Sequence, residues 1–136
     1  MPSRFDPDID RLSAILRGHR HDRLISLLQQ HLERVPAAAL ATDDTARYLA
    51  ANASAQALTG YTAEELRSRT VMDLTPTPLT LTGEKLWGDF IGAGTQHGRY
   101  DLRRKDGTTV AVRYWAYASV APGIHLSVLV PVGRRT

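Results

Sequence analysis

Residues 52–66 read NASAQALTGYTAEEL and carry the local signals of two consecutive short helices. Asn52 and Ser54 are both residue types that cap a helix N-terminus, and Gly60 suits the left-handed backbone that ends a helix. Thr62, with a glutamate three residues later, has the spacing of a capping box. The stretch therefore predicts one short helix before the glycine and a second one directly after it.

The chain before this stretch predicts a helical extension over residues 1–36. Between residues 8 and 35, apolar side chains recur at intervals of three and four, which places them on one side of a helix. Gly18 and the polar residues 19–22 interrupt the pattern, so we expect two helices or one kinked helix. The helix should end before Pro36, because the residue preceding a proline disfavours helical backbone.

Strands are expected on both sides of the short helices. Two short apolar runs after Pro36, separated by Asp43-Asp44-Thr45, predict a hairpin over 37–42 and 47–51. Further along, residues 70–74 predict another helical turn. Thr82 is placed to cap a longer helix over 83–91. Lys105-Asp106-Gly107 is a strong hairpin signal. The strands expected in this last third are 98–104, 108–119 and 124–132.

The strand over 108–119 is largely apolar on both faces. Val112 and Tyr114 alternate with Trp115 and Tyr117, so the two sides of the sheet carry similar side chains. A sheet of this kind is covered on both sides. The helical extension is the natural cover for the face that the short helices leave open.

This order of elements resembles the PAS family. Residues 52–66 resemble its pattern N-x-A-x-x-x-x-x-G-Y-S/T-x-E-E-L, and Asp73-Leu74 with Pro76 and Arg104-Lys105-Asp106-Gly107 resemble the segments that follow. The resemblance implies an α+β PAS fold over 37–132: a five-stranded antiparallel sheet with short helices on one face and the N-terminal extension on the other. Residues 133–136 are left as a short tail.

The resemblance further implies a sensory signalling module that dimerises and responds to a ligand or partner. Its output would be a kinase, a cyclase or a transcription regulator, with this chain either standing alone or forming part of such a protein. A constitutive interaction module without any ligand is the alternative. A small enzyme of the ketosteroid isomerase type is a second alternative, with candidate groups at Asp89, Asp101, Tyr114 and His125.

The composition favours a bacterial cytoplasmic protein. Apolar residues make up 43% of the chain, no run reaches the length of a membrane span, and the acidic, proline-containing N-terminus is no signal peptide. Cysteine is absent, which excludes disulfides and thiol nucleophiles. The net charge is +3, and arginines are mixed with acidic residues, so we expect no nucleic-acid partner. No membrane partner is expected either.

Cofactor signals are weak. A reactive cysteine follows the Gly-Tyr pair in flavin-binding light-oxygen-voltage domains, whereas Thr70, Val71 and Met72 stand there in this chain. Aliphatic residues replace the flavin-holding amides, at Leu102, Val112 and Leu129, and each unpaired ring group costs about 1–3 kcal/mol. The longer helix has no haem-ligating histidine; His97 and His125 lie outside it. We therefore expect neither flavin nor haem.

We expect no metal site and no catalytic residue. His19 and His21 do not share a helix face, and no histidine and acidic set completes a tetrahedral site. Sequences typical of serine hydrolases, phosphate-binding loops and zinc proteases are also absent.

Two sets of residues are the candidates for function. The first would line an apolar pocket for a small apolar metabolite between sheet and helices, with Tyr114 and His125 orienting it. Its candidates are Leu58, Val71, Met72, Leu86, Phe90, Tyr100, Leu102, Val112, Tyr114 and Leu129, with Leu66 and Leu74 beside them. The second would form a homodimer interface on the extension and the outer sheet face. Its candidates are Leu12, Leu16, Leu24, Leu28, Leu32, Trp115 and Tyr117.

Overall fold

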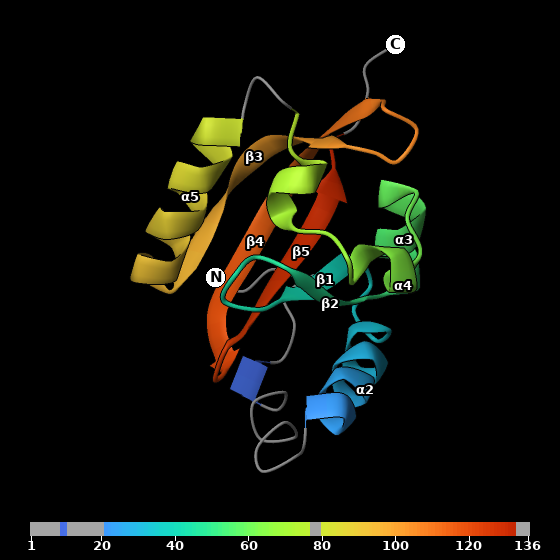
Figure 1. Ribbon diagram of the computed structural model, residues 1–136, viewed down its shortest axis with the longest axis vertical. Coiled ribbons are helices and arrows are strands. Elements are labelled where there is room, and N and C mark those ends of the chain that lie inside the picture. The colour runs from blue at the N-terminus through green and yellow to red at the C-terminus, as the bar shows by residue number, and fades with distance from the viewer. Residues whose placement is uncertain (1–8, 11–20, 77–79, 133–136) are drawn as a thin grey trace.

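The computed structural model describes residues 9–10, 21–76 and 80–132. Its centre is a five-stranded antiparallel sheet in the order β2-β1-β5-β4-β3, so the first and last strands of the chain pair in the middle (Figure 1). The strands are β1 (Ala38–Thr42), β2 (Tyr48–Ala51), β3 (Thr95–Arg103), β4 (Thr109–Ala121) and β5 (Ile124–Pro131). The helices are α2 (His21–Leu32), α3 (Ala53–Thr59), α4 (Ala63–Leu66), the 3-10 helix η1 (Val71–Leu74) and α5 (Thr80–Ala93).

The caps predicted around α3 and α4 are present. The Asn52 side chain accepts a hydrogen bond from the Ala55 N–H, so Asn52 and not Ser54 begins α3. Gly60 ends that helix with φ +80°, a conformation that costs glycine nothing. Thr62 and Glu65 close the capping box of α4 in both directions, at 3.0 and 2.9 Å.

The longer helix and the strand after it extend beyond their predicted bounds. Helix α5 begins at Thr80, not after Thr82, and continues through Gly92 to Ala93. Gly94 alone makes the turn, with φ +88° and its N–H bonded to the Phe90 carbonyl at 2.9 Å. Strand β3 can therefore start at Thr95, and β4 lengthens to Ala121 beside it.

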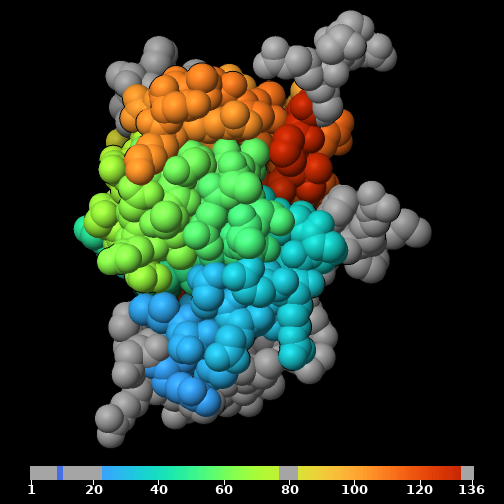
Figure 2. All heavy atoms as spheres, turned by 90° about the vertical axis from the view of Figure 1, so that its right-hand side faces the viewer, coloured from blue at the N-terminus to red at the C-terminus, as the bar shows by residue number. Residues whose placement is uncertain are grey.

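Different elements cover the two faces of the sheet, with the outer face covered at β1, β2 and β5. Alternate residues of β1 divide between two cores: Ala38 and Leu40 face α3–α5, while Ala39 and Ala41 face α2. Leu28 and Leu32 of α2 complete the second core and are fully buried. Figure 1 shows α2 beside β1 and β2, and Figure 2 shows its blue atoms packed directly against the rest of the domain. The predicted cover is therefore confirmed for this part of the extension.

Helix α2 also satisfies the backbone of the edge strand β2. The Gln29 side chain donates from Nε2 to the Ala51 carbonyl at 2.6 Å and accepts from the Ala51 N–H at 3.1 Å. An exposed strand edge invites pairing with other chains, and this amide occupies part of it. In the part of the chain that the structure describes, no helix is long and apolar enough to cross a membrane.

Asn52 connects α2, β1 and α3 through one buried side chain. Its Oδ1 accepts from the Ala39 N–H at 3.0 Å and from the Ala55 N–H at 2.9 Å. Its Nδ2 donates to the carbonyls of Leu32 and Ala37, both at 2.8 Å. The residue is 2% exposed, so water cannot replace these partners.

Replacing this side chain should therefore be costly. We expect Asn52→Ala to lower the free energy of unfolding by about 3 kcal/mol, because several buried backbone groups lose their partners at once. Urea denaturation measures this value. The matched control is Thr62→Ala, which removes an exposed cap and should cost about 1 kcal/mol. Equal effects of the two variants would contradict the special role of Asn52.

Candidate functional site

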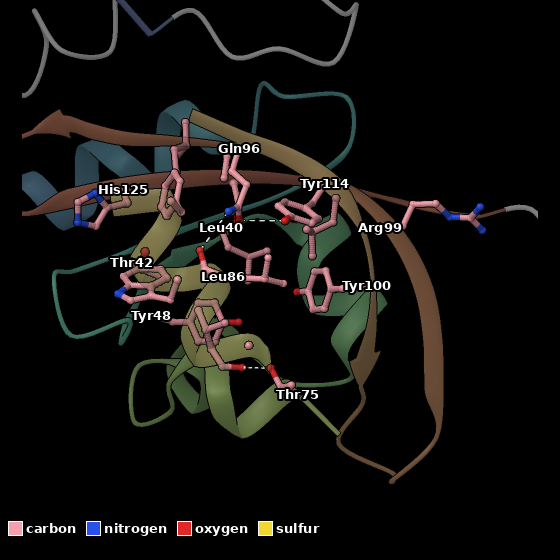
Figure 3. A pocket seen from close by; sticks show the side chains of 18 of the residues that line it. Leu40, Thr42, Tyr48, Thr75, Leu86, Gln96, Arg99, Tyr100, Tyr114 and His125 are labelled. Carbon is pink, nitrogen blue, oxygen red and sulfur yellow. Dashed lines mark hydrogen bonds between the residues drawn. The ribbon is translucent and has the colours of Figure 1, made fainter. Parts of the chain in front are cut away.

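A cavity of about 430 Å³ lies between the inner face of the sheet and the helices η1 and α5 (Figure 3). Leu40, Tyr48 and Leu129 contribute to its wall from β1, β2 and β5. Val71 and Leu86 contribute from η1 and α5. This volume falls within the range of small-molecule sites in proteins.

One wall carries a relay of hydrogen bonds between β4, β3 and α5. The Tyr114 hydroxyl donates to Gln96 Oε1 at 2.9 Å, and Gln96 Nε2 donates to the Leu86 carbonyl at 3.1 Å. Gly98 lies opposite Tyr114 in the β3–β4 register, and a Cβ there would lie 3.4 Å from the tyrosine ring. The glycine therefore leaves room for the Tyr114 ring, and the relay fixes its hydroxyl.

His125 forms a polar end of the cavity and is 1% exposed. Its Nδ1 lies 2.9 Å from the Ser119 N–H, and its Nε2 lies 2.7 Å from Asp44 Oδ1. A backbone N–H can only donate, so Nδ1 must be the acceptor, and we assign the ring proton to Nε2. The ring also makes edge-to-face contacts with Trp87 and Phe90, at centroid distances of 5.7 and 5.9 Å.

Two further tyrosines reach the cavity from β2 and β3. Tyr100 packs edge-to-face on Tyr114, with ring centroids 5.4 Å apart. Burial raises the pKa of Tyr48 well above its ordinary value, and nearby Tyr100 and Asp73 add to the rise. Burial, followed by the proximity of Tyr114, raises the pKa of Tyr100 as well. Both phenols therefore stay protonated at neutral pH.

The structure brings six of the ten predicted pocket residues to the cavity wall. These are Val71, Leu86, Phe90, Tyr100, Tyr114 and Leu129. Four others are not part of the wall: Leu58, Leu102 and Val112 are buried in the filled core, and Met72 packs toward Gly83. Leu66 and Leu74, at 1% and 0% exposure, also belong to the filled core.

Sequence reasoning missed most of the polar lining. Thr42, Tyr48, Thr75, Gln96 and Ser127 all contribute to the wall. Tyr48 and Thr42 had a usable signal, since both lie at hairpin ends where alternation assigns a face. Gln96 had no such signal, because the strand was predicted to begin only at residue 98.

Of the four candidate groups of the enzyme alternative, Asp101, Tyr114 and His125 line the cavity and Asp89 does not. Asp89 is exposed on α5 and pairs with Lys85 at 3.1 Å. Asp101 lies exposed on β3 at the rim, while Tyr114 and His125 are inside with their own hydrogen bonds. Within the described ranges, no three histidine, aspartate or glutamate side chains gather as a metal site.

Comparison with known proteins agrees with this geometry. The family model described as "PAS fold" matches residues 26–130, most of the chain. The chain belongs to the PAS family. Domains of this family are generally sensory and non-enzymatic. No curated protein matches the chain.

Solved structures show the same fold at low identity. A Rhodobacter sphaeroides LOV protein is 15% identical, with a TM-score of 0.69 over 85% of this chain and 70% of its own. A domain of a sensory box sensor histidine kinase/response regulator from Geobacter sulfurreducens is 17% identical, with a TM-score of 0.64 over 82% and 98%. The PAS domain of a LuxR-family transcriptional regulator from Burkholderia thailandensis, in complex with ethanol, is 16% identical, with a TM-score of 0.63 over 76% and 95%.

The residues of this PAS domain that were considered for flavin and haem lie in different surroundings. Of the three positions where flavin-holding amides were sought, Leu102 and Val112 are fully buried and Leu129 lines the cavity. The amide of Gln96 is bonded at both ends. His125 would have to give up a hydrogen bond to ligate an iron. His97 is exposed. It is paired with Trp115 of β4, on the face of the sheet that points away from the cavity.

The predicted dimer residues of the PAS domain separate into three groups. Leu28 and Leu32 are 0% exposed within the single chain, so they belong to its own core and not to an open surface. Leu24, Trp115 and Tyr117 are partly buried. Leu12 and Leu16 lie outside the described residues.

The assigned form of His125 can be tested by NMR and by substitution. Nitrogen-15 spectra should show an unprotonated Nδ1 and a protonated Nε2. His125→Ala should lower the free energy of unfolding by about 3 kcal/mol, because it empties buried space and leaves the Ser119 N–H unpaired.

Asp44→Ala is the matched control. The Asp44 side chain is 73% exposed, so its removal should cost less than about 1 kcal/mol. A protonated Nδ1, or a larger loss from Asp44→Ala than from His125→Ala, would contradict the assignment.

Proposed function

We propose that this PAS domain is a cytoplasmic sensor that binds a small, mainly apolar molecule in the cavity. The cavity itself carries the proposal, because most of its wall is aliphatic or aromatic and only a few polar groups converge on it. A molecule enclosed there would contact β1, β2, β3, β4, β5, η1 and α5 together. Its binding free energy could therefore favour one arrangement of these elements over another.

The architecture supports a route from the cavity to the opposite side of the sheet. Leu40 faces the cavity, and its neighbours Ala39 and Ala41 face α2 through the same strand. A ligand that shifts β1 would shift the surface on which α2 packs. We propose α2 and the preceding segment as the element that transmits the signal.

The related domains indicate what the signal would control. Similar domains occur in a sensor histidine kinase and in a LuxR-family regulator, and the latter structure contains ethanol. We propose that the output of this chain is likewise a kinase, a cyclase or a transcription regulator. The competing function is a constitutive interaction module whose cavity stays without ligand.

Mass spectrometry under native conditions, preceded by an absorption spectrum, distinguishes the two functions. Protein purified without refolding should carry an additional non-covalent mass. Leu86→Trp should abolish it, because an indole at this wall position occupies the cavity. The matched control, Ile91→Trp, adds the same side chain at a 40% exposed position of the same helix and should retain the mass.

A clean apo mass, combined with no change in melting temperature across a library of aromatic fragments, would favour the interaction module. Retention of the mass by Leu86→Trp would place the bound molecule elsewhere on the protein.

We further propose a homodimer through the outer sheet face around Trp115. Substituting Leu28 or Leu32 would disrupt the core, so Trp115→Glu is the informative variant. Light scattering coupled to size exclusion should show a dimer for the wild type and a folded monomer for Trp115→Glu. Ile91→Glu, which makes the same kind of change on α5, should remain dimeric. A wild-type monomer, or a dimer that survives Trp115→Glu, would refute this interface.

A further inference from the structure

Two tyrosine hydroxyl groups in the cavity have no hydrogen-bond partner among the residues that the structure describes. Among the described residues, no hydrogen bond joins the Tyr48 or Tyr100 hydroxyl to another group. Tyr48 is only 3% exposed, and both hydroxyl groups turn toward the middle of the cavity (Figure 3). Neither hydroxyl is among the fully buried side-chain atoms without a partner, so both oxygens are accessible at the cavity surface and can donate to a ligand atom.

Several other polar groups of the cavity do have hydrogen-bond partners. The Tyr114 hydroxyl donates to Gln96 at 2.9 Å, and the Thr75 hydroxyl donates to the Val71 carbonyl at 3.0 Å. His125 uses both ring nitrogens.

Within the described lining, the hydroxyls of Thr42 and Ser127 and the Trp87 indole N–H also lack a bonded partner. Tyr48 and Tyr100 are a pair whose free donors both turn toward the middle of the cavity (Figure 3).

The surroundings disfavour a negatively charged ligand. Burial raises the pKa of both phenols, and for Tyr48 the nearby Asp73 adds to the effect. Any further negative charge would meet the same penalty. Arg99 is the one arginine or lysine among the described lining residues, and its side chain extends away from the cavity (Figure 3). A carboxylate would find no cation beside it.

We propose that the ligand is an uncharged aromatic compound whose carbonyl-type oxygen accepts hydrogen bonds from Tyr48 and Tyr100. Its ring body would pack against apolar wall residues such as Leu40, Leu86 and Leu129. This inference rests on the proposed function, since it names the chemistry of the molecule that the cavity binds.

Three compounds of similar shape test the acceptor and its charge. 2-Acetylnaphthalene carries a neutral carbonyl, 2-naphthoate carries a carboxylate, and 2-ethylnaphthalene carries no acceptor. Calorimetry or Trp87 fluorescence should show the ketone binding about tenfold more tightly than the hydrocarbon, as expected for hydrogen bonds to buried donors. The carboxylate should bind more weakly than the ketone.

Tyrosine-to-phenylalanine variants assign the effect to the two hydroxyls. Tyr48→Phe and Tyr100→Phe should each weaken binding of the ketone by about five- to tenfold and leave the hydrocarbon unchanged. Tyr61→Phe is the matched control, because Tyr61 stacks under Arg69 and does not line the cavity. It should change neither affinity.

Stability of the unliganded variants gives a second measurement. Because the Tyr48 hydroxyl bonds to none of the described residues, Tyr48→Phe should melt at the wild-type temperature or above it. Tyr114→Phe, which removes the bond to Gln96, should melt below it. If Tyr48→Phe by itself lowers the melting temperature, the premise that the Tyr48 hydroxyl has no bonded partner is wrong.

The outcomes separate this inference from the proposed function. Equal affinity for the ketone and the hydrocarbon, or unchanged ketone binding by Tyr48→Phe and Tyr100→Phe, would overturn the acceptor while leaving the cavity as a ligand site. Tighter binding of the carboxylate would overturn the neutral charge. If none of the three compounds binds, the inference fails, and the ligand-binding function is decided separately by the native mass spectrum.

Discussion

The fold depends on the amide side chain of Asn52. Four backbone groups from the end of α2, the start of β1 and the first turn of α3 bond to this one side chain, inside a region that water does not reach. Each bond has both a distance and a direction, so together they fix how the helical extension enters the sheet. Apolar packing alone would hold α2 near the sheet without fixing its position.

The fixed position of α2 also affects the cavity on the other side of the sheet. With α2 and Gln29 fixed on one side of β1 and β2, the inner residues of these strands face the core that α3, α4, η1 and α5 cover. Tyr48 reaches the cavity for this reason, from a strand of only four residues. The polar and apolar parts of the cavity thus depend on contacts made on the opposite side of the sheet.

Local signals allowed much of the fold to be predicted. The caps at Asn52 and Thr62 use backbone groups within a few residues, so they could be recognised from sequence, and the order of strands followed from the family resemblance. The bounds of α5 and β3 could not, because Gly94 and not Gly92 makes the turn. For the cavity, apolar character identified Leu86 and Phe90 but also selected Leu102, since a sequence does not show whether an apolar side chain lines a space or fills it.

The end of β4 has a further consequence. Ser119 has φ +54°, and the register with β5 shifts between Tyr117 and Ala121. Alternation therefore fails here: Val112, Tyr114 and Ala116 face the cavity side, whereas Val120, with the same parity, is buried in the opposite core. A relative lacking one residue at this point would keep regular alternation and turn a different side chain inward. Alignments that ignore the bulge would then assign the wrong residues to the cavity wall. Insertions and deletions at this point would therefore change which side chains face the cavity without changing a residue of the remaining strands.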